Sequence, residues 1–189
     1  GSSTIFAQIV SAETGIPIER IAVRHPDTFI TPYDRTTSAS RGTFHAGAAV
    51  MNAAKDAWRQ LSEYAAEVYG CAPEEIRGCG GLMLGPKEGQ ALTVGKLIKK
   101  AVLGGIDIIG QGYSRLKGGT GLERETGQGE NPTSFWMYAA DAALVETDTR
   151  TGQVRVLKVY AASDVGRAIN KENCRQQIQG GVAMGLGIG

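Results

Sequence analysis

The stretch SDVGRAINKENCRQQIQGGVAMGLGIG, residues 163–189, decides the fold prediction for this chain. Ile178, Val182 and Leu186 recur every four residues after Asn170, a spacing that predicts an amphipathic helix. Each glycine inside a helix costs about 1 kcal/mol relative to alanine, so a cluster indicates a close approach to the helix surface. A flat ligand, a second backbone or a tightly packed sheet could make that approach, and the spacing leaves these alternatives open. The clustered glycines are Gly180, Gly181, Gly185 and Gly187.

Two predicted strands precede this helix. Residues 135–146 and 154–161 are rich in apolar side chains, and the sequence DTRTG at 148–152 between them is a good hairpin turn. We therefore expect a β-hairpin that leads into the carboxy-terminal helix.

Three further helices are predicted from the spacing of apolar residues. The first covers residues 4–14 and ends at Gly15. The second runs from about residue 40 to residue 68 and ends at Gly70, and the third covers residues 93–103. The first half of the second helix consists almost entirely of small residues, which favours close packing against it.

Short strands are expected at residues 21–23, around 82–84 and at 106–109. Polar, glycine-rich loops are expected at residues 27–34 and 115–132.

The order of these elements predicts the fold class. Helices and strands interleave without a regular β-α-β order, so we expect an α+β fold with helices packed on a mixed β-sheet. We expect three lobes, which are residues 1–70, residues 71–134 and residues 135–189.

Composition limits the class of protein. Apolar residues make up 42% and charged residues 21%, as in ordinary soluble globular proteins, and the net charge of +1 excludes a nucleic-acid-binding footprint. No apolar run approaches the roughly 20 residues of a membrane span and no signal peptide opens the chain, so we expect a cytoplasmic protein. Cys71, Cys79 and Cys174 have no C-x-x-C spacing, which argues against a zinc or iron–sulfur site and for reduced, buried thiols.

The sequence PYDRTTSASRGT at 32–43 lies directly before the long helix. A helix start presents unpaired N–H groups and a positive dipole end, so it can bind phosphate or another oxyanion. Arg41 would add positive charge to such a site. One serine would suffice for ordinary N-capping, and the excess of hydroxyls favours an anion site. The hydroxyl residues are Thr36, Thr37, Ser38, Ser40 and Thr43.

The other polar candidates have simpler interpretations from the sequence alone. Gln177 and Gln179 beside the glycine cluster suit the edge of a heterocycle, although an exposed helix face is the more usual explanation. His25 and His45 lack partners at ligand or triad spacing and are expected to be structural. Asp164 precedes a glycine turn and is expected to cap it.

Several segments, in this order, resemble the molybdopterin-binding large subunit of the molybdenum hydroxylases, the family of xanthine dehydrogenase, aldehyde oxidase and aerobic carbon monoxide dehydrogenase. The resemblance covers the carboxy-terminal part of that subunit and most of this chain outside its middle third. The segments are GSSTIFAQI at 1–9, GIPIERIAV and DTFITPYDRTTSASRGT within 15–43, FWMYAADAALVETDTRTGQVRVLKVYAASDVGRAIN at 135–170 and QIQGGVAMGLG at 177–187.

The resemblance implies a molybdenum-cofactor-binding-domain-like fold and a bound molybdopterin dinucleotide, expected in its cytosine form. In such enzymes a G-Q-G turn, hydroxyls at a helix start and the first glutamine of Q-(V/I)-x-G-G contact the cofactor. The implied cofactor-binding residues are Gly1, Ser2, Ser3, Thr4, Ser38, Ala39, Ser40, Arg41, Gly42, Thr43 and Gln177.

Enzymes of this kind hydroxylate an aldehyde, an N-heterocycle or carbon monoxide with oxygen from water, and iron–sulfur and FAD groups reside on partner subunits. Their catalytic glutamate would follow Gly189, so we expect no catalytic residue here and no activity of this portion alone. Lys171 stands where a proline is usual. The partners implied are the rest of the large subunit and the iron–sulfur and flavin subunits, in a homo- or hetero-oligomer without nucleic acid or membrane. The alternative is a non-catalytic assembly domain of a split or truncated subunit.

Overall fold

A computed structural model describes residues 1–34, 37–115, 119–133 and 135–188. The chain forms two compact units, Gly1–Arg115 and Leu116–Gly189, and each is described here by itself. Residues 71–115 of the expected middle lobe therefore belong to the first unit, and the three-lobe division stays a prediction. Helices and small sheets are combined in one chain, which confirms the α+β class.

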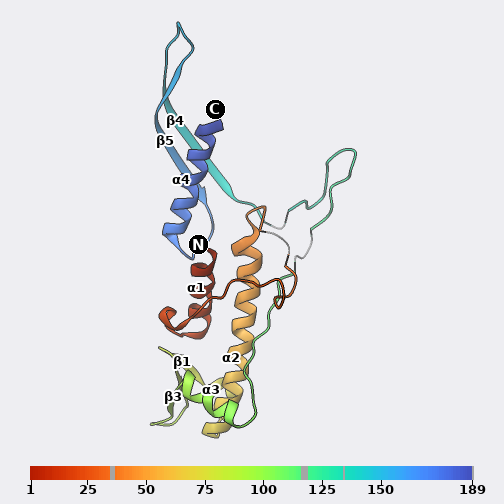
Figure 1. The fold of residues 1–189 in the computed structure, drawn as a ribbon, viewed down its shortest axis with the longest axis vertical. Helices are drawn as coiled ribbons and strands as arrows, with labels where there is room; N and C mark the ends of the chain where they lie inside the picture. Colours follow the sequence, from red (N-terminus) through yellow and green to blue (C-terminus); the bar gives the residue numbers. More distant parts are fainter. Residues whose placement is uncertain (35–36, 116–118, 134, 189) are drawn as a thin grey trace. The chain divides into compact units, whose positions relative to one another are not determined.

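Two long helices lie side by side in unit 1 (Figure 1). Helix α1 (Ser2–Thr14) ends at Gly15, whose φ of 66° is the left-handed conformation that favours glycine. Helix α2 (Gly47–Tyr69) follows the π-helical turn η2 (Gly42–Ala46) and ends in the same way at Gly70. Both helices were predicted with these stops, and the π-helical start of the second was not.

The core of unit 1 lies at the carboxy-terminal end of α2. Strands β1 (Arg77–Cys79), β2 (Leu82–Leu84) and β3 (Ala91–Thr93) form an antiparallel sheet in that order. The Thr93 hydroxyl accepts from the Lys96 N–H and caps α3 (Val94–Leu103). Short 3-10 turns, η1 (Ile18–Arg20) and η3 (Pro73–Glu75), complete the unit. The buried core comprises Leu61, Ala65, Ala66, Ile76, Met83 and Leu97.

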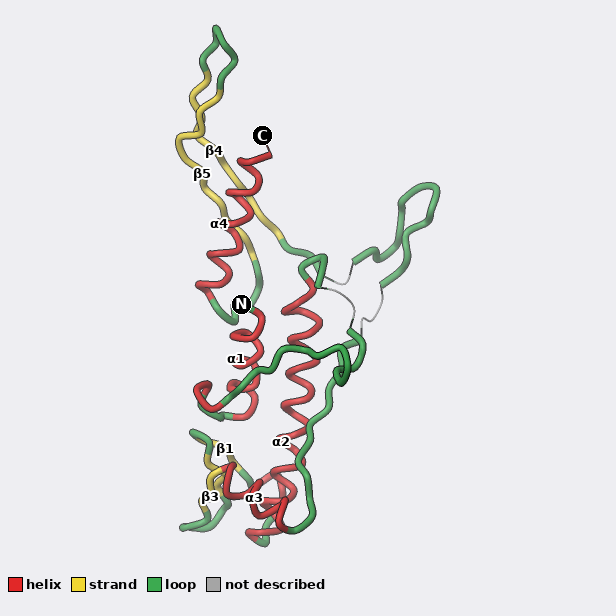
Figure 2. The backbone as a smooth tube through the Cα atoms, viewed as in Figure 1, coloured by secondary structure: helices red, strands yellow, loops and turns green. Residues whose placement is uncertain are grey.

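The segment after α3 runs along the side of α2 (Figure 2). A strand was expected at residues 106–109, and this was wrong because the segment pairs with a helix and with no strand of the described chain. The strand expected at residues 21–23 was wrong for a similar reason. Ile21 has extended dihedrals, φ −107° and ψ 116°, but no described strand lies beside it.

Unit 2 contains a long hairpin and the carboxy-terminal helix. Strands β4 (Tyr138–Thr147) and β5 (Val154–Asp164) pair in antiparallel fashion around the predicted turn, where Gly152 has a φ of 77°. Helix α4 (Lys171–Ile188) follows, and Asn170 accepts from the Asn173 N–H at 3.0 Å to cap its start. Asp164 accepts from the Gly166 N–H at 2.9 Å, which confirms its capping role. None of the described residues of unit 2 is buried.

Two further expectations need correction. Both sheets in the described residues are antiparallel, so the single mixed sheet was wrong: each sheet is built from neighbouring hairpins, which turn the chain back on itself. All three thiols are free, as expected, but Cys79 is exposed and the other two are half-buried. No helix in the described ranges has both the length and the apolar character that crossing a membrane requires.

Candidate cofactor-binding site

The amino-terminal ends of α1 and η2–α2 lie at the same end of unit 1. A Cβ added at Gly47 would lie 3.1 Å from Ile9 Cδ1, and Lys55 forms an ion pair with Glu13 at 3.9 Å. The residue numbers increase in the same direction along both helices, because Ile9 lies beside Gly47 and Glu13 lies beside Lys55. Helices α1 and α2 therefore run in parallel (Figure 1). At about 1.5 Å per residue, the start of α1 lies roughly 10 Å before Ile9, and the start of η2 lies roughly 8 Å before Gly47. The two helix starts are therefore at similar positions along the helix pair.

This parallel arrangement brings two predicted groups of residues to one end of the unit. Ser2, Ser3 and Thr4 form the first turn of α1, and residues 38–43 lead into η2. Two helix dipoles thus direct their positive ends the same way, which favours an anion there. Thr36, one of the predicted hydroxyls, lies outside the described residues.

The loop before η2 has an unusual backbone. Ala39 and Ser40 both have positive φ, 50° and 54°, and such strain in non-glycine residues is typical of ligand-binding segments. Neither residue at these helix starts can cap the helix with its side chain, because Gly1 has none and the Arg41 guanidinium has no acceptor. Arg41 forms an ion pair with Asp34 at 3.4 Å and remains partly accessible.

Gln177 belongs to unit 2, so its proximity to the helix starts stays a prediction. It is exposed on α4, and at 100° per residue it shares a face with Gly180, Gly181 and Met184. A Cβ added at any of the four clustered glycines of α4 would meet no described atom within 4 Å. Tight packing on the hairpin therefore does not explain the cluster, and the glycine face is open to a ligand or another chain segment.

A row of polar side chains on α2, which sequence reasoning missed, holds residues 108–113, here called the strap. Gln60 donates to the Ile109 carbonyl at 2.9 Å, and Asp56 accepts from the Gln111 N–H at 3.1 Å. Asn52 donates to the Tyr113 carbonyl at 3.0 Å. Eight helical residues span about 12 Å and four extended residues about 13 Å, so the two spacings match.

Glycines allow the strap to lie directly on the helix backbone. A Cβ at Gly112 would overlap the Ala53 nitrogen and the Ala49 oxygen, and one at Gly110 would overlap the Ala53 oxygen. The small residues of α2 thus have the close neighbour that the sequence predicted. The i, i+4, i+8 spacing of polar residues on the small-residue helix was the signal that could have revealed it.

The contacts around the strap also change the pKa values of the charged groups beside it. The Gln111 N–H, and after it the Arg59 guanidinium, hold the pKa of Asp56 below its usual value. Arg59 lies 2.9 Å from Asp56 and 2.8 Å from Glu63, and these contacts raise the pKa of the guanidinium. The Asp56 carboxylate that accepts the hydrogen bond from the strap is therefore ionised at neutral pH.

The described residues contain no group of three or more His, Cys, Asp or Glu side chains that could hold a metal ion. His45 packs edge-on against Phe44, with ring centroids 5.1 Å apart, and His25 is exposed.

The chain matches the molybdopterin cofactor-binding domain family over residues 1–189 and belongs to that family. It is 29% identical to the carbon monoxide dehydrogenase large chain of Hydrogenophaga pseudoflava over 189 residues, which are 100% of this chain and 22% of that one. It is 30% identical over 192 residues to the nicotine 6-hydroxylase large subunit of Paenarthrobacter nicotinovorans, covering 100% of this chain and 22% of the relative.

Solved structures share the fold. The structure matches quinoline 2-oxidoreductase from Pseudomonas putida 86 with a TM-score of 0.75 at 23% identity, over 97% of this chain and 22% of the other. A Cu,Mo-CO dehydrogenase structure matches with a TM-score of 0.73 at 22% identity, over 95% and 21%. The chain thus spans about a fifth of the length of these proteins. The predicted family and its cofactor-binding-domain-like fold are confirmed.

Proposed function

We propose that this chain is the molybdopterin-dinucleotide-binding portion of a larger molybdenum-dependent oxidoreductase. The observation that supports this proposal is the parallel pair of helix starts in unit 1, which brings the first turn of α1 and the start of η2 to the same end of the unit. The family and the names of its similar relatives support the proposed reaction class. The enzyme hydroxylates an aldehyde, an N-heterocycle or the carbon of carbon monoxide with oxygen from water.

The donor set fits a dinucleotide. Phosphate oxygens are anionic acceptors, and the site offers backbone N–H groups at two helix starts together with neighbouring hydroxyls. A Cβ at Gly42 would meet no described atom within 4 Å, so there is room at this helix start. In unit 2, the open glycine face beside Gln177 has space for a flat ring.

The residues of this chain hold and orient the cofactor. The cofactor supplies the oxidation–reduction chemistry when it is bound. Residues 1–4 and 38–43 hold the pyrophosphate, with Arg41 as the cation of the site. Gln177, which offers both a donor and an acceptor, sets the orientation of the ring system. The chain contributes no general base.

Chemical analysis of the full-length gene product tests this proposal. The purified subunit is expected to contain molybdenum and pterin in equal amounts and to release one CMP per pterin on hydrolysis. We further expect it to copurify with iron–sulfur and flavin subunits in the cytoplasmic fraction. Release of AMP or GMP would correct the cytosine form, and a properly matured subunit without pterin would overturn the proposal.

Residues 1–189 alone are expected to be inactive, because the proposal places the base and most of the substrate pocket elsewhere. Molybdenum-dependent turnover by this portion would contradict that expectation.

The absence of buried residues in the described part of unit 2 favours a second candidate, a non-catalytic assembly domain. Size-exclusion chromatography, combined with measurement of the bound pterin, distinguishes the two candidate functions. A monomer that holds pterin supports the cofactor-binding function, and an obligate dimer without pterin supports the assembly domain.

A further inference from the structure

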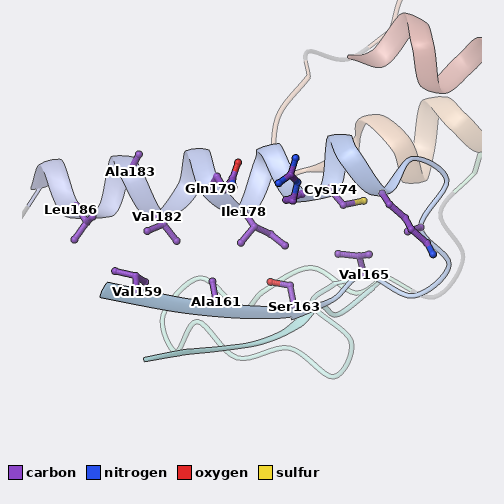
Figure 3. A pocket seen from close by; sticks show the side chains of 13 residues that line it. Val159, Ala161, Ser163, Val165, Cys174, Ile178, Gln179, Val182, Ala183 and Leu186 are labelled. Carbon is purple, nitrogen blue, oxygen red and sulfur yellow. The ribbon is translucent and has the colours of Figure 1, made fainter. Parts of the chain in front are cut away.

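Helix α4 and strand β5 face each other across an apolar groove. Figure 3 shows Ile178, Val182 and Leu186 of the helix directed toward Val159, Ala161 and Ser163 of the strand. The cavity between them has a volume of about 550 Å³. That is room for on the order of 18 water molecules at roughly 30 Å³ each, so the helix and the strand leave an open groove between their apolar rows.

The described part of unit 2 lacks a core of its own. None of its described residues is buried, and large apolar side chains on both sides of the groove stay accessible, 49% for Leu186 and 41% for Val165. An isolated two-stranded hairpin is marginal in water, and here helix α4 leaves none of the described hairpin residues buried. The groove is therefore incomplete and needs an apolar neighbour.

We propose that this groove is filled by an apolar segment of the same large subunit, from outside residues 1–189. The inference rests on the proposal that the chain is part of a longer subunit, and this chain covers only 22% of each of the two relatives described above. Most of the groove lining is apolar, and its polar members are Ser163, Lys171, Arg175 and Gln179. Arg175 is already paired with Glu172 at 2.7 Å, so an apolar occupant fits the lining better than a small polar ligand.

Site-specific photo-crosslinking in the full-length subunit tests the occupant. A diazirine-bearing aliphatic amino acid replaces Leu186, whose size it matches, and crosslinked peptides are identified by mass spectrometry. The expected crosslink joins position 186 to an apolar peptide outside residues 1–189 of the same polypeptide. The same amino acid at Met184, which is not part of the groove lining, is the control and is expected to give a different product.

Crosslinks from position 186 only to residues 1–115, only to a second copy, to a bound small molecule or only to water would each overturn the inference. A gene product of no more than 189 residues would do the same. Pterin content is measured on the same preparation: a subunit without pterin that still gives the expected crosslink refutes the proposed function while the inference stands.

Discussion

Gly112 is the position at which the structure most clearly leaves no room for a side chain. An added Cβ would overlap the Ala53 nitrogen and the Ala49 oxygen, both part of the α2 backbone, which cannot move aside. Gly112→Ala is expected to lower the free energy of unfolding by about 1–3 kcal/mol. Chemical denaturation measures it. Gly119→Ala, where the Cβ meets nothing within 4 Å, is the control and should stay within about 0.5 kcal/mol. Equal losses of stability in the two variants would contradict the close packing of the strap on α2.

Asp56 gives the strap a dependence on pH. Hydrogen bonding lowers its pKa in the folded state from the usual 3.8, so its contribution to stability is complete above that value. The contribution is lost as the pH falls through the folded pKa. Asp56→Asn should therefore lower the melting temperature at about pH 6, and the difference from the parent should shrink toward about pH 3. The exposed Asp107→Asn serves as the control, and a difference that does not change with pH would contradict the strap contact.

At the scale of elements, the sequence was informative wherever periodicity and a glycine stop agreed. Helices α1, α2, α3 and α4 and the hairpin lie where their patterns predicted them. Residues 21–23 and 106–109 have the composition of strands, but composition does not say whether a partner strand is available. The strap instead finds its partners in side chains of α2 that are distant in sequence.

The candidate site was predicted in the same uneven way. A helix start rich in hydroxyls is a local pattern, so the sequence alone singled out residues 38–43 as a candidate. The parallel alignment with α1 depends on the contacts of Ile9 and Glu13 across the helix pair. Gln177 was singled out by family resemblance and not by physics.

The open face of α4 predicts a separation of stability from cofactor binding. Gly181→Ala adds a methyl group that meets no described atom and improves helix propensity, so stability should rise by up to about 1 kcal/mol. If the pterin lies against this face, the pterin content of the full-length subunit should fall. Gly95→Ala on α3, also in open space, is the matched control and should keep its pterin. Full pterin content in both variants would contradict a pterin position against this face of α4.

At the scale of the whole molecule, burial is divided unevenly between the units. Unit 1 has a core around Met83 and Leu97, both fully buried, and the described part of unit 2 has none. Amides of β4 and β5 in isolated residues 1–189 should therefore exchange with deuterium at least about tenfold faster than those of α2 near Leu61. In the full-length subunit, hairpin exchange should slow. Equal protection of both units in isolation would contradict this division.

The most direct measurement of the central claim is the pterin content of two variants at one position. Gly42 opens the helix start where we propose that the pyrophosphate binds, and its φ and its surroundings accept a side chain. Gly42→Asp places a negative charge there, which favours the helix dipole by about 0.3–1 kcal/mol but repels phosphate. Gly42→Asn has nearly the same shape without the charge. The account predicts that the full-length Asp variant folds at least as stably as the Asn variant and retains much less molybdopterin dinucleotide. Equal dinucleotide content in the two variants would contradict it.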